Sequence, residues 1–172
     1  MIVENKKSEK KVLKKIWDKV LEMEDPYLTY KDQGGFRSRP MHVISNELTG
    51  PEIHFFSSAK NEDYLNDKIP RDVTVNFKKD KDYLVLRGRA TTSRDSQEIK
   101  KFWEEDTDDW FPNEEDKKNV CLIKVQINEG EMWQSISSGL TRKLEILKSR
   151  LLSRKPKLSE KFNFSFSNPI KV

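Results

Sequence analysis

The first feature of the hydrophobic pattern is an amphipathic helix near the N-terminus. Between residues 8 and 23, apolar side chains recur every three or four positions, while lysines occupy the other face. Ser8 is a residue type that caps the start of a helix, and Asp25-Pro26 is a sequence that ends one. The pattern therefore predicts a helix over 8–23 with one buried face. That face consists of Val12, Ile16, Trp17, Val20 and Met23.

After this helix, apolar and polar positions alternate, with Gly, Pro and Asp at the turns between the runs. Such alternation is typical of β-strands, because successive side chains point to opposite faces. Gly88 interrupts one run and predicts a bend or a close approach of two backbones. About six antiparallel strands with short turns predict a mainly β fold, and the long ones favour a barrel over an open sheet. The expected strands are 27–31, 36–46, 52–58, 72–77, 83–92 and 119–134.

Helical spacing returns at three later places, at 61–68, 96–104 and 140–152. The last segment is basic and amphipathic, and we expect its apolar face to pack on the barrel or on a second subunit. This leucine face consists of Leu140, Leu144, Leu147, Leu151 and Leu152. We expect the chain end around 163–166 to be an extended strap.

The net charge of the chain is small but unevenly distributed. The formal net charge is +4, which does not by itself indicate a nucleic-acid-binding protein. Residues 139–172 carry nine basic and two acidic side chains, a local charge of +7, so the remaining residues sum to −3. Between residues 98 and 118, nine acidic side chains accompany four basic ones, which predicts a solvated acidic edge.

A length of 172 residues fits a single domain that can bury a substantial core. We divide it into the helix at 8–23, a barrel over 27–135 and a basic tail over 139–172. Cys121 is the single cysteine and lies in an apolar run, which predicts a buried structural thiol and no intrachain disulfide. No apolar stretch approaches the length of a membrane span, and the N-terminus lacks a signal-peptide core. These features predict a protein of the reducing cytoplasm.

Common sets of catalytic residues are absent from the sequence. His42 and His54 are the only histidines, and two histidines without a placed carboxylate make a poor metal site. The sequence contains no nucleophile elbow, no glycine-rich phosphate loop and no HExxH motif. We therefore predict neither a metal site nor a catalytic side chain.

The strongest candidate for chemistry is a set of residues suited to a flat, anionic cofactor. Arg37 and Arg39 sit two residues apart on an extended segment, so both guanidinium groups leave the same strand face. Pro40 cannot donate to a strand ladder and therefore indicates an edge strand or a bulge. Ser57-Ser58 offers hydroxyl and backbone donors, and the N-terminus of the helix at 61–68 favours phosphate. The alternative is a solvated strand end with two surface arginines.

Aromatic residues near chain turns could cover the ring of such a cofactor. The candidates are Phe56, Trp110, Phe111 and Trp133. Trp110 and Trp133 fit a core or a subunit interface equally well.

Six short motifs, taken in order, resemble those of a known family. They are Arg37-Ser38-Arg39-Pro40-Met41, Phe55-Phe56-Ser57-Ser58, Val73-Thr74-Val75-Asn76-Phe77, Arg87-Gly88-Arg89-Ala90, Trp110-Phe111-Pro112 and Met132-Trp133. The ordered set is similar to the general stress proteins of the pyridoxamine 5′-phosphate oxidase-like group, and the resemblance covers nearly the whole chain. It implies the FMN-binding split β-barrel fold, mainly β with peripheral helices at both ends.

The resemblance also implies a homodimer that binds FMN in clefts at the subunit interface. The flavin would lie along the strand with Arg39-Pro40-Met41, with Ser57-Ser58 beside its phosphate. Trp110-Phe111 resembles an aromatic pair that reaches the cleft from the interface side. FAD, a deazaflavin and haem are alternative cofactors, since related barrels use them. The residues expected to bind the cofactor are Arg37, Ser38, Arg39, Pro40, Met41, Phe56, Ser57, Ser58, Lys60, Asn61, Trp110, Phe111 and Trp133.

Asp63 departs from the family pattern. The family has Ser or Thr at the position of Asn61, and Lys or Arg at the position of Asp63, where the cation ordinarily binds the phosphate. An anionic side chain beside a phosphate is unfavourable. Either Lys60 takes over this role, or the chain binds FMN weakly or prefers another ligand.

The resemblance implies a flavin-dependent oxidoreductase that uses a nicotinamide or another small electron donor, with the redox chemistry supplied by the flavin. Pyridoxamine 5′-phosphate oxidase activity itself is not expected, because the tail lacks that enzyme's substrate-binding signature. One alternative is a non-catalytic flavin-binding or stress-response protein. Another is a nucleic-acid-binding module that uses the basic tail, although packing explains the leucine face more simply.

Overall fold

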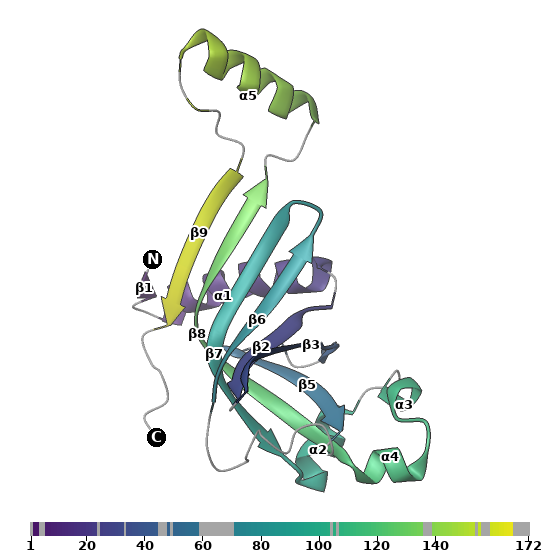
Figure 1. Cartoon of the computed structure of the whole chain (residues 1–172). Coiled ribbons are helices and arrows are strands. Elements are labelled where there is room, and N and C mark those ends of the chain that lie inside the picture. Colours follow the sequence, from purple (N-terminus) through teal and green to yellow (C-terminus); the bar gives the residue numbers. More distant parts are fainter. Residues whose placement is uncertain are drawn as a thin grey trace.

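The computed structural model describes residues 2–3, 6–23, 25–32, 34–44, 48, 50–58, 71–103, 105, 107–135, 139–153, 155 and 159–166. Within them the strands are β1 (Ile2–Val3), β2 (Tyr27–Asp32), β3 (Gly35–Pro40), β4 (Val43–Ile44), β5 (Glu52–Ser58), β6 (Arg71–Lys79), β7 (Asp82–Ser93), β8 (Val120–Ser135) and β9 (Ser159–Phe166). The helices are α1 (Lys6–Glu22), α2 (Ser96–Phe102), α3 (Thr107–Trp110), α4 (Glu114–Lys118) and α5 (Gly139–Leu151). The predicted mainly β fold with peripheral helices is confirmed (Figure 1).

All these strands belong to one sheet, which runs in the order β1-β9-β8-β7-β6-β2-β3. Strand β8 is the centre of the arrangement because it pairs with three others. One of its edges is taken by β7, while the other is shared by β5 along the first half and β9 along the second. Strand β5 also pairs with β4. The sheet therefore divides along β8, with β5 and β4 lying off the main path of strands.

Gly88 marks the point where this division occurs. The β7–β8 register shifts between Arg87 and Gly88, and a Cβ atom at Gly88 would overlap the backbone carbonyl oxygen of Gln126. Only glycine permits so close an approach of two strands. The predicted close approach is confirmed, and it lies where the neighbour of β8 changes from β5 to β9.

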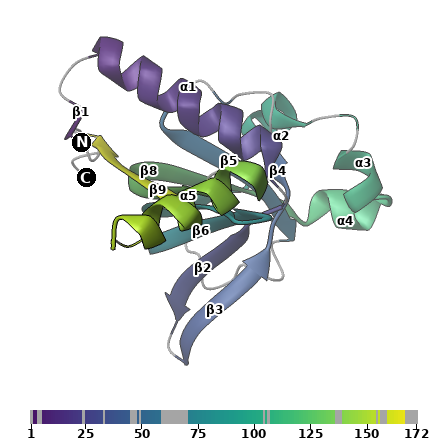
Figure 2. The ribbon, with the colours of Figure 1, turned by 90° about the horizontal axis from the view of Figure 1, so that it is seen from above.

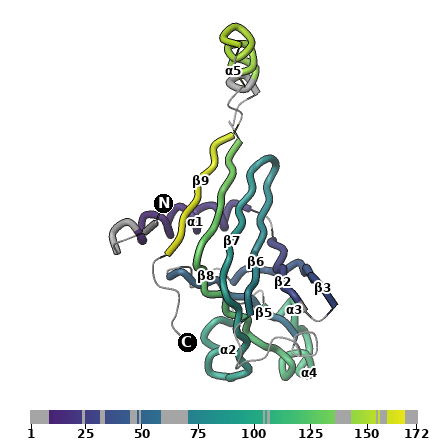
Figure 3. Tube along the Cα trace, turned by 60° about the vertical axis from the view of Figure 1, so that its left-hand side comes forward, coloured from purple at the N-terminus to yellow at the C-terminus, as the bar shows by residue number. Residues whose placement is uncertain are grey.

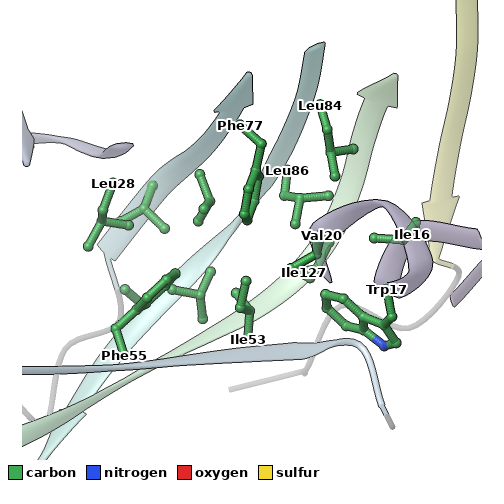
Figure 4. Close-up of a cluster of buried hydrophobic side chains, with 14 of the residues drawn as sticks. Ile16, Trp17, Val20, Leu28, Ile53, Phe55, Phe77, Leu84, Leu86 and Ile127 are labelled. Atoms are coloured by element: carbon green, nitrogen blue, oxygen red, sulfur yellow. The ribbon is translucent and has the colours of Figure 1, made fainter. Parts of the chain in front are cut away.

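Helix α1 covers the sheet with the face that the sequence predicted. Ile16, Trp17 and Val20 are buried in the main core, close to strand residues such as Leu84 and Ile127 (Figure 4). In the view from above, α1 runs along one side of the sheet, and the β2–β3 hairpin extends from the other (Figure 2).

The start of α1 differs from the prediction. The helix begins at Lys6, so Ser8 lies inside its first turn and does not precede it as a cap. The two added residues, Lys6 and Lys7, are of a type that readily forms helix.

The run predicted as one strand over 36–46 is divided into β3 and β4. Strand β3 ends at Pro40, because proline has no N–H to donate to a ladder. The next residue, Met41, donates its backbone N–H to the carbonyl oxygen of Pro26 at 2.9 Å. Met41 is buried in the main core, and residues 45–47 lie outside the described residues.

The acidic stretch contains α3 and α4, which the periodicity did not predict. These helices have four and five residues, too few to show a helical repeat. Asn113 caps α4 by accepting a hydrogen bond from the backbone N–H of Asp116, and Asp95 caps α2 in the same way. The chain end predicted as a strap is β9, which is paired with β8. The helix predicted over 61–68 lies outside the described residues.

Helix α5 occupies the predicted segment, but its packing differs from the expectation. Figures 1 and 3 show α5 beyond the ends of β8 and β9, apart from the rest of the fold. Leu144, Leu147 and Leu151 are exposed. The expectation that they pack on the barrel of the same chain is therefore wrong, whereas packing on a second subunit stays a prediction.

Cys121 is buried in β8, as the apolar run predicted. Among the residues that the structure describes, no helix is both long and apolar enough to cross a lipid bilayer.

Candidate functional site

A cleft with a volume of about 520 Å³ lies where β3, β5, α3 and α4 approach one another. In Figure 1 the end of β5 lies beside α3 and α4, at the end of the sheet opposite α5. The cleft is lined by Arg39, Pro40, Met41, His42, Ile44, Phe56, Ser57, Ser58, Thr107, Trp110, Phe111 and Asp116.

Three segments that are distant in the sequence bring the expected site residues to this cleft. The first is the end of β3 with the break that follows it, the second is the end of β5, and the third is α3. Strand β5 is held by β4 on one side and β8 on the other, with Ser57 opposite Cys121. The expected residues that line the cleft are Arg39, Pro40, Met41, Phe56, Ser57, Ser58, Trp110 and Phe111.

Two expected residues lie earlier on β3, outside the cleft lining. Arg37 is opposite Tyr30 of β2, and Ser38 is opposite Thr29. The hydroxyl groups of Ser38 and Thr29 are hydrogen-bonded at 2.8 Å. Both Arg37 and Ser38 are exposed, so a second subunit or a longer ligand could still reach them.

Trp133 lies far from the cleft of its own chain. It is near the end of β8, between Tyr83 of β7 and Lys161 of β9. The ammonium group of Lys161 is 5.0 Å from the centre of the indole ring. Trp133 therefore cannot be grouped with the cleft residues of the same chain.

Lys60 and Asn61, together with the unusual Asp63, lie outside the described residues. Their predicted contribution to phosphate binding is therefore not placed relative to the cleft.

The cleft contains four residues that were not expected there: His42, Ile44, Thr107 and Asp116. His42 stacks on Trp110, with ring centres 5.7 Å apart and planes 26° apart. Its Nδ1 lies 3.0 Å from a carboxylate oxygen of Asp25. His42 directly follows the motif that ends at Met41, and this adjacency was a signal in the sequence.

The other additions carry no comparable sequence signal. Thr107 and Asp116 belong to the acidic stretch that looked like a solvated edge. Thr107 is buried, and Asp116 Oδ2 accepts a hydrogen bond from Asn113 Nδ2 at 2.6 Å. Only the placement of α3 and α4 beside β5 brings them to the cleft.

One wall of the cleft is built from aromatic rings. Phe56 contacts Phe111 with ring centres 6.5 Å apart, and both contact Trp103, at 5.4 and 6.1 Å. These spacings are typical of stabilising aromatic pairs. Trp103 lies behind the two lining rings, so the wall is supported from outside. Trp110, in contrast, is 62% exposed at the mouth of the cleft.

An ion pair connects the two short helices beside the cleft. Lys117 Nζ of α4 lies 2.6 Å from Asp108 Oδ1 of α3. The hydrogen bond from Lys117 lowers the pKa of the Asp108 carboxyl, and in return raises the pKa of the Lys117 ammonium. Both groups are thus held in their charged forms, although surface ion pairs contribute little stability.

Strand β3 lies at one edge of the described sheet. Among the described residues, it pairs only with β2. The sequence indication of an edge strand at Pro40 is therefore confirmed.

The two histidines do not form a common site. His54 is buried against Phe102, with ring centres 4.3 Å apart, and its Nε2 lies 3.4 Å from Glu52 Oε2. This contact with His54 does more than any other to lower the pKa of the Glu52 carboxyl. Within the described part of the chain, no group of three or more His, Cys, Asp and Glu side chains could hold a metal ion.

A comparison with family models gives one match. The model described as pyridoxamine 5′-phosphate oxidase like covers residues 11–157 of the chain. This range includes all the cleft residues. The comparison with curated proteins gives no match.

Solved structures share the fold at low sequence identity. One is a protein from Jannaschia sp. CCS1 with the provisional name general stress protein 26; it is 22% identical, with a TM-score of 0.68, and the match covers 91% of this chain and 99% of that one. General stress protein 26 from Bacillus anthracis is 21% identical, with a TM-score of 0.55 and coverages of 70% and 92%. The general stress FMN/FAD binding protein from Xanthomonas citri is 20% identical, with a TM-score of 0.57 and coverages of 76% and 95%. At these identities the structures support the fold alone.

Proposed function

The chain belongs to the pyridoxamine 5′-phosphate oxidase-like family, and we propose that it is an FMN-binding general stress protein that acts as a homodimer and transfers electrons. The observation that carries the proposal is the cleft itself. Eight residues that the motifs point to, from three separate parts of the chain, line one cavity of suitable size.

The cleft residues fit a flavin mononucleotide in size and in chemistry. A volume of about 520 Å³ lies within the range of roughly 300–1,000 Å³ that is usual for cofactor sites. Arg39, Ser57 and Ser58 offer a cation and hydroxyl donors, which suit a phosphate. The lining also has apolar and aromatic surface suited to a flat ring, from Met41, Ile44, Phe56 and Phe111.

The charges in the cleft suggest how such a ligand is oriented. Asp116 is anionic and already accepts a hydrogen bond from Asn113, so the α4 side disfavours a phosphate. The Asp116 carboxylate can instead accept hydrogen bonds from hydroxyl or N–H groups of the ligand. We therefore assign the phosphate to the side of Arg39 and Ser57, and the ring to the side of the aromatic wall.

The protein's own part in the reaction is binding, orientation and exclusion of water. The bound flavin would supply the redox chemistry, accepting electrons from a nicotinamide or another small donor. Arg39 can stabilise negative charge beside the cofactor, and the rings of Phe56 and Phe111 keep water from one wall. No side chain is required as a general base.

A second subunit would complete the cleft. Trp110 is 62% exposed and Arg39 is half-buried, so the cleft is open at its mouth. An open groove on a half barrel can be closed by a symmetry-related copy. The single, buried Cys121 is compatible with our proposal that the protein works in the reducing cytoplasm.

The test is a titration of purified, flavin-stripped protein with FMN, followed by flavin fluorescence. We expect saturable binding near one FMN per chain, with FAD and a deazaflavin as parallel ligands. Absence of saturable binding for all three would contradict the proposal.

A second step separates an oxidoreductase from a non-catalytic flavin binder. NADH or NADPH is added to the flavin-loaded protein without oxygen, and the flavin absorbance is recorded. Bleaching of the bound flavin faster than that of free FMN supports electron transfer. Tight binding without bleaching by either nucleotide favours the non-catalytic alternative.

A further inference from the structure

Helix α5 carries an exposed apolar surface that the fold of one chain leaves uncovered. Leu144 is 48% exposed, Leu147 55% and Leu151 77%. At 100° per residue these three positions fall within about 60° of one another, so they form one stripe along the helix. We call Leu144, Leu147 and Leu151 the leucine stripe.

The leucine stripe is on the outward side of α5. The less exposed residues of the helix, Glu145, Ile146 and Ser149, fall on the other side of its axis. Figures 1 and 3 agree that α5 stands beyond the ends of β8 and β9. Each Å² of apolar surface that stays in water forgoes roughly 25 cal/mol of the free energy that burial would release. A contiguous exposed stripe of this kind therefore indicates a partner.

The charges beside the leucine stripe restrict what this partner can be. Lys148 flanks the stripe on one side, and Lys143 and Arg150 flank it on the other; all three are exposed. A fitting partner surface has acidic groups around an apolar centre.

This same chain presents such a surface at the cleft. An acidic rim of exposed carboxylates lies on and beside α3 and α4, with the exposed ring of Trp110 among them. We define the acidic rim as Glu105, Asp108, Asp109, Glu114 and Glu115. Asp108 is paired with Lys117, and the acidic rim as a whole carries the complementary charge.

The positions of the two surfaces favour contact between chains. Helix α5 lies beyond one end of the long strands, and α3 and α4 lie at the other end (Figure 1). Within one chain they are separated by the length of the sheet. A two-fold axis across the strands exchanges the two ends and brings α5 of each copy to α3 and α4 of the other.

We propose that α5 is an arm that docks its leucine stripe on the acidic rim and Trp110 of a second copy, so that each subunit covers the other's cleft. This inference rests on the homodimer of the proposed function. It adds the residues that make the contact, and it makes the partner's α5 part of the cofactor site.

A charge-exchange experiment tests the arm directly. In the first variant, Lys143→Glu and Lys148→Glu reverse the charge of the arm. In the second, Asp109→Lys and Glu114→Lys reverse the charge of the rim. Each variant alone meets like charge at both contacts of its homodimer. In a mixture, the hybrid dimer has opposite charges at both contacts. At one contact the glutamate arm meets the lysine rim, and at the other the unaltered arm meets the unaltered rim.

Sedimentation equilibrium measures the outcome for each protein and for the equimolar mixture. We expect the dimer Kd of each variant to rise at least about tenfold, and the mixture to regain a Kd close to that of the original protein. Lys10→Glu with Lys11→Glu, on the exposed side of α1, is the control for the arm variant, because it makes the same change of net charge. Leu147→Ser, which adds no charge, should weaken the dimer and should not be rescued by the lysine rim of the second variant.

The outcomes separate this inference from the proposed function. If the original protein is a dimer and both variants alone remain dimers, the proposed contact between α5 and the acidic rim is wrong, while the proposed flavin site is unaffected. If the original protein is a monomer, both the arm and the homodimer fail, and the FMN titration still reports on the cleft. Sedimentation of a monomer with vesicles of phosphatidylserine, but not of phosphatidylcholine, would assign α5 to an anionic membrane surface and overturn the arm.

Discussion

Arg39 and Arg37 leave the same face of β3, yet only Arg39 lines the cleft. We therefore predict that Arg39→Ala weakens FMN binding at least about tenfold, or about 1.4 kcal/mol, the scale of one charge-assisted hydrogen bond. The measurement is a fluorescence titration of both proteins. Arg94→Ala, an exposed arginine outside the cleft, is the control and should bind FMN as the original protein does. Equal affinity of the Arg39 variant would remove this residue from the site.

Gly88 gives a prediction about stability at a single residue. In Gly88→Ala the new methyl group would overlap the backbone carbonyl oxygen of Gln126, so the β7–β8 ladder must shift. We expect a loss of about 1–3 kcal/mol in the free energy of unfolding, measured by urea denaturation. Gly50→Ala is the matched control, because its Cβ atom would meet nothing within 4 Å. A loss of equal size in both variants would show that the close approach is not the cause.

Residue types alone separated the cleft residues from their neighbours only in part. Arg37 and Arg39 looked equivalent in the sequence. A strand pattern shows that two side chains share a face, but it does not show which part of that face borders a cleft. Trp133 looked as suitable as Trp110, because both are large aromatic residues near turns. The difference between them comes from the fold, in which α3 borders the cleft and the end of β8 borders β9.

At the scale of elements, α1 depends on its buried face. Ile16 is fully buried against the sheet, while Leu21 of the same helix is 64% exposed. We predict that Ile16→Ala lowers the free energy of unfolding by about 2–5 kcal/mol, through lost apolar burial and a cavity. Leu21→Ala should cost far less when both are compared by urea denaturation. Similar losses would mean that α1 does not pack on the sheet through this face.

Helix α2 is tied to β8 by an ion pair that makes its stability depend on pH. Lys124 Nζ lies 2.7 Å from Glu98 Oε1. This hydrogen bond does more than any other contact to lower the pKa of Glu98 from its ordinary value of 4.5. Between the lowered pKa and 4.5, the unfolded chain binds more protons than the folded one. The stabilisation from this ion pair is therefore fully present above pH 4.5, and it is lost as the pH falls from 4.5 through the lowered pKa of Glu98.

We predict that Glu98→Gln flattens the loss of stability below pH 4.5. The pair is partly exposed, so the effect at neutral pH should be small, about 0.2–1 kcal/mol. Urea denaturation of both proteins at several pH values measures the slope. Asp80→Asn, at an exposed carboxylate in a turn outside the acidic rim, is the control. Identical slopes for the original protein and Glu98→Gln would exclude this ion pair as a source of acid sensitivity.

For the whole molecule, the proposed cofactor and the proposed dimer both bear on thermal stability. A ligand that binds only the folded state at about 100 times its Kd stabilises the protein by roughly 2.7 kcal/mol. We predict that FMN at this excess raises the Tm, and that the Tm also rises with protein concentration if the folded state is a dimer. Differential scanning fluorimetry at several concentrations of each measures both effects. Riboflavin, which lacks the phosphate, is the control ligand, and an equal shift with riboflavin would exclude a phosphate contact.

Local patterns and short motifs along the chain were enough to indicate most elements and the family. Periodicity is a local property, so it was enough to place α1, α5 and most strands. Residue type was enough to mark Gly88 and an edge position at Pro40, whereas the division of 36–46 into two strands was not predicted. The order of short motifs was enough to indicate a split barrel, because it samples nearly the whole length of the chain. Neither property required knowledge of which strands pair.

Which candidates share a site depends on contacts between distant parts of the chain. His42, Thr107 and Asp116 join Arg39 and Ser57 because β5 pairs with β4 and β8 while α3 and α4 lie beside it. The outward leucine stripe of α5 was likewise not readable from its periodicity, since an amphipathic pattern predicts a buried face without naming the surface that buries it. Pairing and packing join residues that are distant in the chain, and a local pattern carries no record of those contacts.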